Sequence, residues 1–128
     1  MSVPVLHEGD VEEMQLPGRR FRWLVSEGSI PSDHCSVCVI RVPPGEKVRP
    51  AHSHPHSDEV IYIMSGSGRV LVAGEVAPVR TGSAVLFPQG AVHMLQNTGA
   101  EEMKVVCFFA PATTLDNYVM HEGVDFPE

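Results

Sequence analysis

The sequence predicts an all-β protein, either a sandwich or a barrel of short strands. Runs rich in β-branched and aromatic residues recur at near-regular spacing with turn residues between them, which is typical of both architectures. Glycine and proline, 11 of each, are scattered along the chain, as many turns require. No segment keeps a helical period of 3.6 residues. A length of 128 residues fits one domain with its own core.

Strands are expected throughout the central part of the chain, where glycine or proline clusters separate them. In chain order they are residues 21–25, 34–42, 59–64, 69–73, 76–80, 84–87, 92–96 and 103–110. Pro78 marks its strand as an edge strand or a bulged one, because proline cannot donate to a sheet. Two aromatic residues of these runs, Trp23 and Phe108, are expected in the pocket wall or the core, with the core favoured.

The expected barrel occupies residues 21–110, between two segments of less regular pattern. Residues 1–20 mix proline, glycine and acidic residues, and we expect an extended arm with at most one short strand. Residues 111–128 form a tail, in which 115–120 is expected to make a short helix.

The charge and cysteine content narrow the classes of partner. A net charge of −7 gives no basic patch for nucleic acid and no attraction to an anionic membrane surface, so neither partner is expected. Three cysteines, an odd number without regular spacing, do not form a disulfide framework. No basic segment followed by a long apolar run opens the sequence, so we expect a cytoplasmic protein.

Two stretches carry residues that bind metals. Residues 52–59 hold three histidines and two carboxylates, and a second stretch, residues 82–97, has His93 near its centre. Residues two apart on a strand share a face, so His52 and His54 can point at one place. Glu59 opens the next strand and can direct its carboxylate to the same place.

Imidazoles combined with one carboxylate suit a divalent transition metal, and Fe, Mn, Ni, Zn and Cu all remain candidates. The pair His54 and His56, followed by Glu59, is an alternative ligand set. In the first arrangement, His56 lies beside the ligands or in solvent.

The two stretches resemble the two conserved motifs of the cupin superfamily. The stretch HSHPHSDEVIYIMSG, residues 52–66, resembles the first motif, H-x-H-x4-E-x6-G. The stretch GSAVLFPQGAVHMLQN, residues 82–97, is similar to the second, G-x5-P-x-G-x2-H-x3-N, at every position. One departure is that six residues rather than five separate Gly45 from His52.

This resemblance implies a double-stranded β-helix, the jelly-roll barrel of cupins. It implies one divalent transition metal inside the barrel, held by His52, His54, Glu59 and His93. It also implies a homodimer, in which residues 1–20 can be the arm that subunits exchange. The sequence leaves open whether the tail closes the barrel mouth or covers the dimer.

Strand alternation indicates which residues share the ligands' face. Ile61 and Ile63 share the face of Glu59, and Leu95 shares that of His93, so all three are expected to line the pocket. Four cations near the expected mouth can hold a substrate carboxylate: Arg41, Lys47, Arg49 and Arg69.

Three functional hypotheses fit these residues, each with a small organic molecule as partner. The favoured one is a metal-dependent enzyme such as an Fe(II) or Mn(II) dioxygenase. The second is a redox-neutral lyase or isomerase, because similar small cupins include lyases of dimethylsulfoniopropionate that use a tyrosine near the metal. Ile61 stands where that tyrosine would be expected. The third is a non-catalytic module that binds a small acid or sugar.

Overall fold

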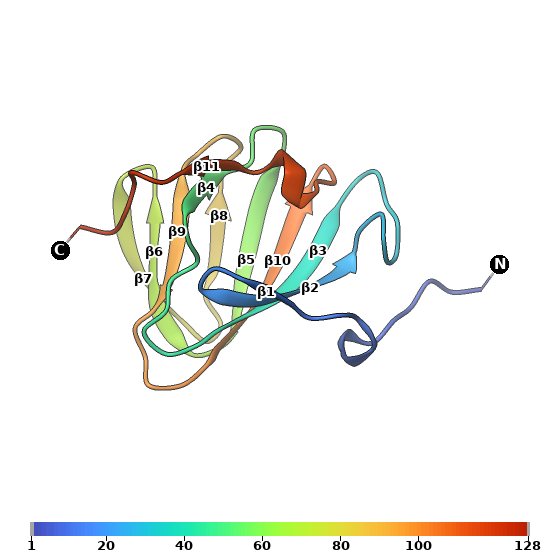
Figure 1. Ribbon diagram of the computed structural model, residues 1–128, viewed down its shortest axis with the longest axis horizontal. Coiled ribbons are helices and arrows are strands. Elements are labelled where there is room, and N and C mark those ends of the chain that lie inside the picture. The colour runs from blue at the N-terminus through green and yellow to red at the C-terminus, as the bar shows by residue number, and fades with distance from the viewer. Residues whose placement is uncertain (1, 128) are drawn as a thin grey trace.

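The computed structural model describes residues 2–127, and nearly all of its regular structure is β (Figure 1). The strands are β1 (Met14–Leu16), β2 (Arg19–Val25), β3 (Ser36–Val42), β4 (Ala51–Ser53), β5 (Asp58–Ser65), β6 (Ser67–Val72), β7 (Glu75–Arg80), β8 (Ala84–Phe87), β9 (His93–Asn97), β10 (Met103–Ala110) and β11 (Val119–His121). Two single-turn 3-10 helices, η1 (Glu8–Asp10) and η2 (Leu115–Asn117), complete the described chain. Neither is long enough to cross a membrane.

The strands form two antiparallel sheets, which makes the fold a double-stranded β-helix as the sequence predicts. The larger sheet has the order β1-β2-β3-β10-β5-β8, and the smaller one the order β11-β4-β9-β6-β7. Several neighbours in each sheet are far apart in sequence, such as β3 beside β10 and β4 beside β9. The chain therefore passes repeatedly between the sheets and encloses an interior.

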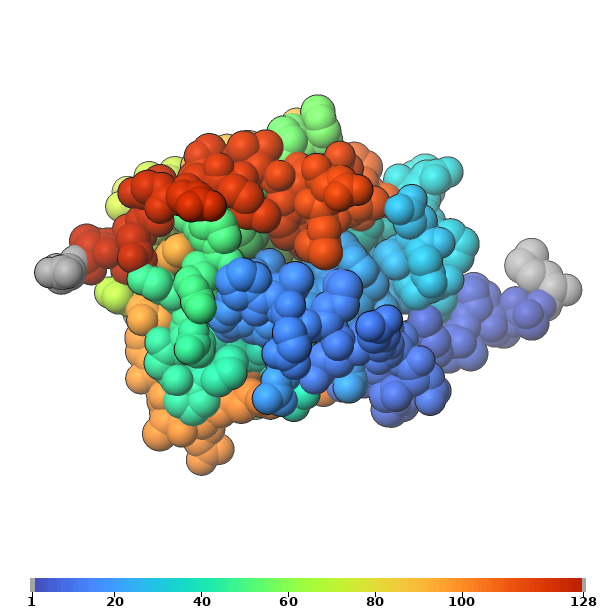
Figure 2. Space-filling model, in the orientation of Figure 1, coloured from blue at the N-terminus to red at the C-terminus, as the bar shows by residue number. Residues whose placement is uncertain are grey.

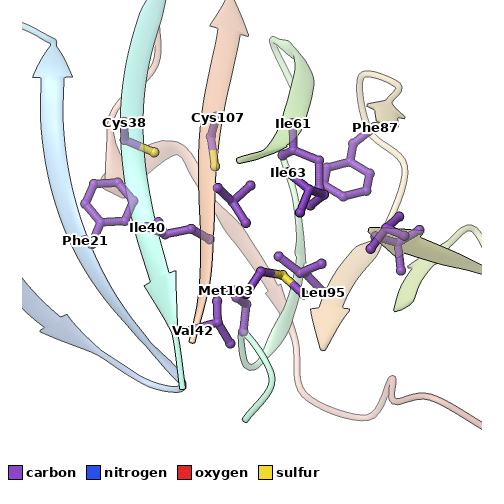
Figure 3. Packing of buried hydrophobic residues seen from close by; sticks show 14 of the residues in the cluster. Phe21, Cys38, Ile40, Val42, Ile61, Ile63, Phe87, Leu95, Met103 and Cys107 are labelled. Carbon is purple, nitrogen blue, oxygen red and sulfur yellow. The ribbon is translucent and has the colours of Figure 1, made fainter. Parts of the chain in front are cut away.

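Strand alternation decides which side chains enter that interior. On β5, Glu59, Ile61 and Ile63 are buried, whereas Val60 and Tyr62 between them are exposed. The inward residues of both sheets pack into one apolar cluster, in which Phe21 and Cys38 lie on one side and Phe87 on the other (Figure 3).

The predicted central strands are confirmed to within about two residues, but two expectations are wrong. Residues 115–120 do not form one helix, because η2 ends at Asn117 and β11 then pairs with the free edge of β4. Phe108 is 42% exposed rather than in the core, because its neighbours Cys107 and Phe109 take the inward positions of β10.

Both flanking segments contribute strands to the barrel. The N-terminal segment supplies β1, which pairs with β2, and the C-terminal segment supplies β11. Before β1 the chain runs away from the barrel, and Val3 and Val5 are each 80% exposed (Figure 1).

Candidate metal centre

Four side chains from both sheets meet in the barrel interior. His52 lies in β4 and His54 directly follows it, whereas His93 opens β9. The pairing of β4 with β9 sets His52 opposite His93. Glu59 reaches the same place from β5 of the larger sheet. All four residues are at least nine-tenths buried.

The spacing of the donor atoms suits one metal ion. One ligand atom from each of the four residues lies within 4.8 Å of the others. Oε1 of Glu59 is 2.9 Å from Nε2 of His54 and 3.1 Å from Nε2 of His93. Two ligands bound at about 2.1 Å and at right angles are about 3.0 Å apart. These two distances therefore match adjacent ligands of one ion.

Backbone carbonyls orient two of the rings. Nδ1 of His52 hydrogen-bonds the carbonyl oxygen of Pro50 at 3.1 Å, and Nδ1 of His93 hydrogen-bonds that of Ala91 at 3.1 Å. A carbonyl can only accept, so each Nδ1 carries the proton and each Nε2 keeps a free lone pair. Outer hydrogen bonds of this kind orient the histidine ligands of metal sites.

Two buried nitrogen atoms in the cluster lack a hydrogen-bond partner. They are Nδ1 of His54 and Nε2 of His93. A buried polar atom without a partner costs about 1–3 kcal/mol and calls for an explanation. An ion held beside Glu59 would satisfy Nε2 of His93, whereas Nδ1 of His54 belongs to a ring whose Nε2 already faces Glu59. The residues present therefore fit a divalent metal.

The protonation states also suit metal binding. Burial first, and then the charge of His93, lower the pKa of His52 to about 3. Burial alone would raise the pKa of Glu59, but the imidazoles of His54 and His93 beside its carboxylate outweigh this effect and hold the pKa below its ordinary value. At neutral pH the site therefore offers a neutral His52 and an ionised Glu59, the forms that bind metals.

A cavity of about 30 Å³ adjoins the cluster, and its wall is mostly apolar. Ile61 and Leu95 line it together with Phe87, whereas Ile63 lies in the core without lining it. A space of this size holds about one or two water molecules. His56 is exposed in the turn before β5 and does not join the cluster.

Tyr118 covers the cluster from the C-terminal segment. Its ring stacks on that of His52 at 5.1 Å between centroids, and meets that of His54 edge-on at 4.3 Å. Burial, followed by the nearby Cys38 and Glu59, raises the pKa of its phenol well above the ordinary value. The tail thus closes this end of the barrel, and Phe126 also packs on the smaller sheet beside Met94.

The four cations that the sequence offers as candidates to hold a substrate carboxylate all have partners within the chain. Arg41 bonds Glu13 and Glu102, Lys47 bonds Asp125, Arg49 bonds Glu46, and Arg69 bonds Gln96 and lies over the ring of Phe126. The buried cation is Arg19, which sequence reasoning missed. One feature of the sequence could have indicated its burial. Arg19 lies two residues before the inward-facing Phe21 on the same strand, and residues two apart share a face.

Comparison with known proteins now places the chain in a family. The family model described as "Cupin domain" matches residues 38–109. The chain belongs to the cupin family. The match covers both stretches that hold the four donors of the candidate metal centre.

Two curated cupin-like relatives come from Streptomyces. SchB of Streptomyces halstedii is 35% identical over 80 residues, which are 62% of this chain and 56% of SchB. The polyketide synthase protein CurC of Streptomyces cyaneus is 28% identical over 111 residues, 87% of this chain and 71% of CurC. The chain thus spans little more than half the length of SchB.

Solved cupin structures share the fold at low sequence identity. Streptomyces PAC13 with uridine, described as a nucleoside dehydratase, has a TM-score of 0.78 and 17% identity, covering 94% of this chain and 92% of PAC13. The polyketide cyclase RemF of Streptomyces resistomycificus has a TM-score of 0.70 and 21% identity, covering 85% and 80%.

Replacing one histidine of the cluster tests the ligand set. We expect His93→Ala to weaken metal binding by more than about tenfold, because it removes one of the four donors. His56→Ala is the matched control and should keep its metal, because His56 is exposed outside the cluster. Metal per chain is measured by elemental analysis, with circular dichroism to confirm folding. Full occupancy in folded His93→Ala would contradict the four-ligand set.

The buried His52 predicts how the stability of the metal-free protein depends on pH. The pKa of His52 is 6.5 in the unfolded chain and about 3 in the folded one, so between these values the unfolded state binds more protons. The free energy of unfolding should therefore fall as pH drops from about 6.5, by up to about 1.4 kcal/mol per pH unit. Urea denaturation of chelator-treated protein measures this. His52→Gln should show a shallower slope, and an unchanged slope would refute the assignment.

Proposed function

We propose that this cupin is a metal-dependent enzyme acting on a small, oxygen-rich organic molecule by redox-neutral chemistry. The reaction class is removal of a proton beside a carbonyl, leading to ring closure or loss of water. The observation that carries the proposal is the convergence of four buried donors around one point. The similarity to RemF, a polyketide cyclase, and to PAC13, a nucleoside dehydratase, supports the redox-neutral class over the oxygenase favoured from sequence, because cyclisation and dehydration are redox-neutral reactions.

A bound divalent metal supplies Lewis-acid polarisation of a substrate carbonyl. The chain's own residues do the rest. Backbone-anchored His52 and His93 keep their donor atoms fixed, so little reorganisation is needed during the reaction. Apolar side chains around the cavity, such as Ile61 and Phe87, exclude water and strengthen the electrostatic interactions inside.

Tyr118 supports proton transfer at this site. In this chain Ile61 stands where the similar cupin lyases of dimethylsulfoniopropionate would have a tyrosine. Tyr118 instead brings a phenol over the same histidines from the C-terminal segment. Because burial raises the pKa of Tyr118, its Oη keeps its proton and can donate a hydrogen bond to a developing negative oxygen.

The C-terminal segment must move for such a substrate to reach the site. The cavity beside the cluster measures about 30 Å³, whereas pockets for small organic ligands measure about 300–1,000 Å³. Tyr118 lies over two of the histidines and its segment is held by β11 pairing with the three-residue strand β4. Opening of this short pairing is the least costly route into the interior.

The test is a mass-spectrometric assay of β-hydroxy ketones and 1,3-diketones with metal-loaded protein in deuterated water. We expect loss of water or deuterium uptake beside the carbonyl, equally with and without oxygen, and a loss of at least about tenfold in rate in Tyr118→Phe. Gain of oxygen with oxygen consumption would instead identify an oxygenase. A melting shift without any turnover would identify a binding module.

The Fe(II) or Mn(II) dioxygenase remains the second candidate. Three imidazoles and one carboxylate form a donor set that suits both metals. The assay above separates the two classes, because an oxygenase turns over only when oxygen is present.

We also propose a cytoplasmic homodimer. The three cysteines are free, as in a reducing compartment, which supports the cytoplasmic location.

The homodimer is supported by an apolar patch on the outer face of the larger sheet. The patch consists of Phe108, Val60 and Leu86, which are each more than a third exposed and are adjacent by strand register. Patches of this kind mark interfaces between proteins.

A charge in this patch should break the dimer. We expect Phe108→Glu to halve the mass measured by light scattering, because an unpaired carboxylate would be buried in the interface. Val76→Glu, similarly exposed but on β7, is the matched control and should leave the mass unchanged. A monomeric wild-type protein would refute the proposal.

A further inference from the structure

We propose that Arg19 anchors a binding site for the carboxylate of a small apolar acid. The site is a groove between the β1–β2 turn, the Arg49–Pro50 segment and the C-terminal segment. These three segments meet on one face of the molecule (Figure 2). This binding site goes beyond the proposed function and does not depend on it, because no candidate metal ligand lines the groove.

Arg19 is a buried cation without an acidic partner. Its side chain is 7% exposed, and no carboxylate of the described residues lies within 4 Å of it. Nη1 donates to the carbonyl oxygens of Pro17 at 3.1 Å and Arg49 at 3.4 Å. Nε and Nη2 donate to no described residue. The edge of the guanidinium that carries Nε and Nη2 thus makes no hydrogen bond to the described residues.

A guanidinium in this position is costly for a purely structural role. Arginine stays charged in proteins, and burying an unpaired charge costs several kcal/mol. Burial accordingly lowers the pKa of Arg19, and the charges of groups such as Tyr118 and Glu59 oppose this effect without a direct ion pair. A lysine or a neutral donor could make the same two contacts to carbonyl oxygens, so these contacts alone do not require an arginine. The two donors that they leave free, Nε and Nη2, have the spacing that binds both oxygens of a carboxylate.

The groove beside Arg19 has room for an organic acid. Its volume is about 270 Å³, and its lining is largely apolar: Leu16, Pro17, Pro50, Leu115 and Met120. Arg49 adds a second cation at the same groove. An adjoining cavity of about 300 Å³ shares Pro17, Arg49 and Pro50 with it. A ligand with one carboxylate and an apolar body fits this lining better than a sugar or an inorganic ion.

The backbone around Arg19 holds the groove in a defined shape. Gly18 has a φ of +80°, and a Cβ atom there would lie 1.7 Å from the carbonyl oxygen of Lys47. The amide of Arg49 donates to the carbonyl oxygen of Pro17 at 3.3 Å. Only glycine allows this close approach, which places Arg19 and Arg49 at one groove.

The groove adjoins the candidate metal centre without containing it. Pro50, which lines the groove, accepts the hydrogen bond of His52 Nδ1. Met120, which also lines the groove, is the register partner of His52 in β11. Occupation of the groove therefore acts on the same short β4–β11 pairing that must open for access to the interior.

One acidic residue also lines the groove. Glu122 is exposed at the rim and has no ion pair with Arg19 or Arg49 among the described residues. Its charge opposes an incoming anion only weakly, because solvent screens it. Glu122→Gln should therefore strengthen binding of an anionic ligand slightly.

The test titrates benzoate, with benzamide as its neutral counterpart, into the full chain as purified and after chelator treatment. Binding is followed by calorimetry and by the NMR signal of the Met120 methyl group. We expect benzoate but not benzamide to bind and to shift that signal in both preparations. Arg19→Gln should weaken benzoate binding by at least about tenfold, the loss expected for a charge-assisted contact.

The controls separate binding from a structural role of Arg19. Arg20→Gln changes an exposed arginine of the same strand and should bind benzoate like the wild type. Arg19→Lys keeps the charge but loses the fork, so it should fold and bind with intermediate affinity. If Arg19→Gln does not fold, Arg19→Lys decides the question.

Wild-type affinity in folded Arg19→Lys and Arg19→Gln would overturn the proposal, as would the absence of benzoate binding to the wild type. Equal binding of benzamide would also overturn it. Arg19-dependent binding in a protein that shows no metal-dependent turnover would uphold the anion site and reject the proposed reaction.

Discussion

The ionised carboxylate of Glu59, enclosed by three imidazoles inside the barrel, is the interaction on which the rest of the structure depends. A buried carboxylate costs several kcal/mol unless charges or donors surround it. Here the larger sheet supplies the carboxylate, and the smaller sheet supplies His52, His54 and His93. The two sheets must therefore close into a barrel for the charge to be satisfied. Because Nε2 of His93 has no hydrogen-bond partner beside this carboxylate, the four side chains form a group that could hold a metal ion.

The mouth of the barrel is built by the two ends of the chain. The C-terminal segment lays Tyr118 over the histidines, and its β11 pairs with β4 by three residues. The N-terminal β1–β2 turn packs against the segment that leads into β4 through the close approach at Gly18. The C-terminal segment thus contacts β4, which carries His52, and the β1–β2 turn contacts the residues that lead into it. Movement at the mouth and geometry at the candidate metal centre are consequently coupled through β4.

Strand alternation predicts that His52 and His54, two residues apart, share a face. The resemblance to the two cupin motifs was needed to add Glu59 and His93 and to favour His52 over His56, and β5 then buries Glu59 on the same side as Ile61 and Ile63. Tyr118 and Arg19 could not be predicted in this way, because they reach the mouth from opposite ends of the chain. Only the closed topology brings them close. The expected helix at 115–120 failed for the same reason, since the free edge of β4 draws Val119–His121 into a strand.

The most direct test of the account is calorimetric titration of Mn(II) or Fe(II), without oxygen, into chelator-treated wild-type protein. The account predicts saturable binding of one ion per chain, a raised melting temperature, and loss of binding in Glu59→Gln, which keeps the shape of the side chain but removes its charge. A wild-type protein that binds neither metal, or a Glu59→Gln variant that binds as tightly as the wild type, would contradict the central claim.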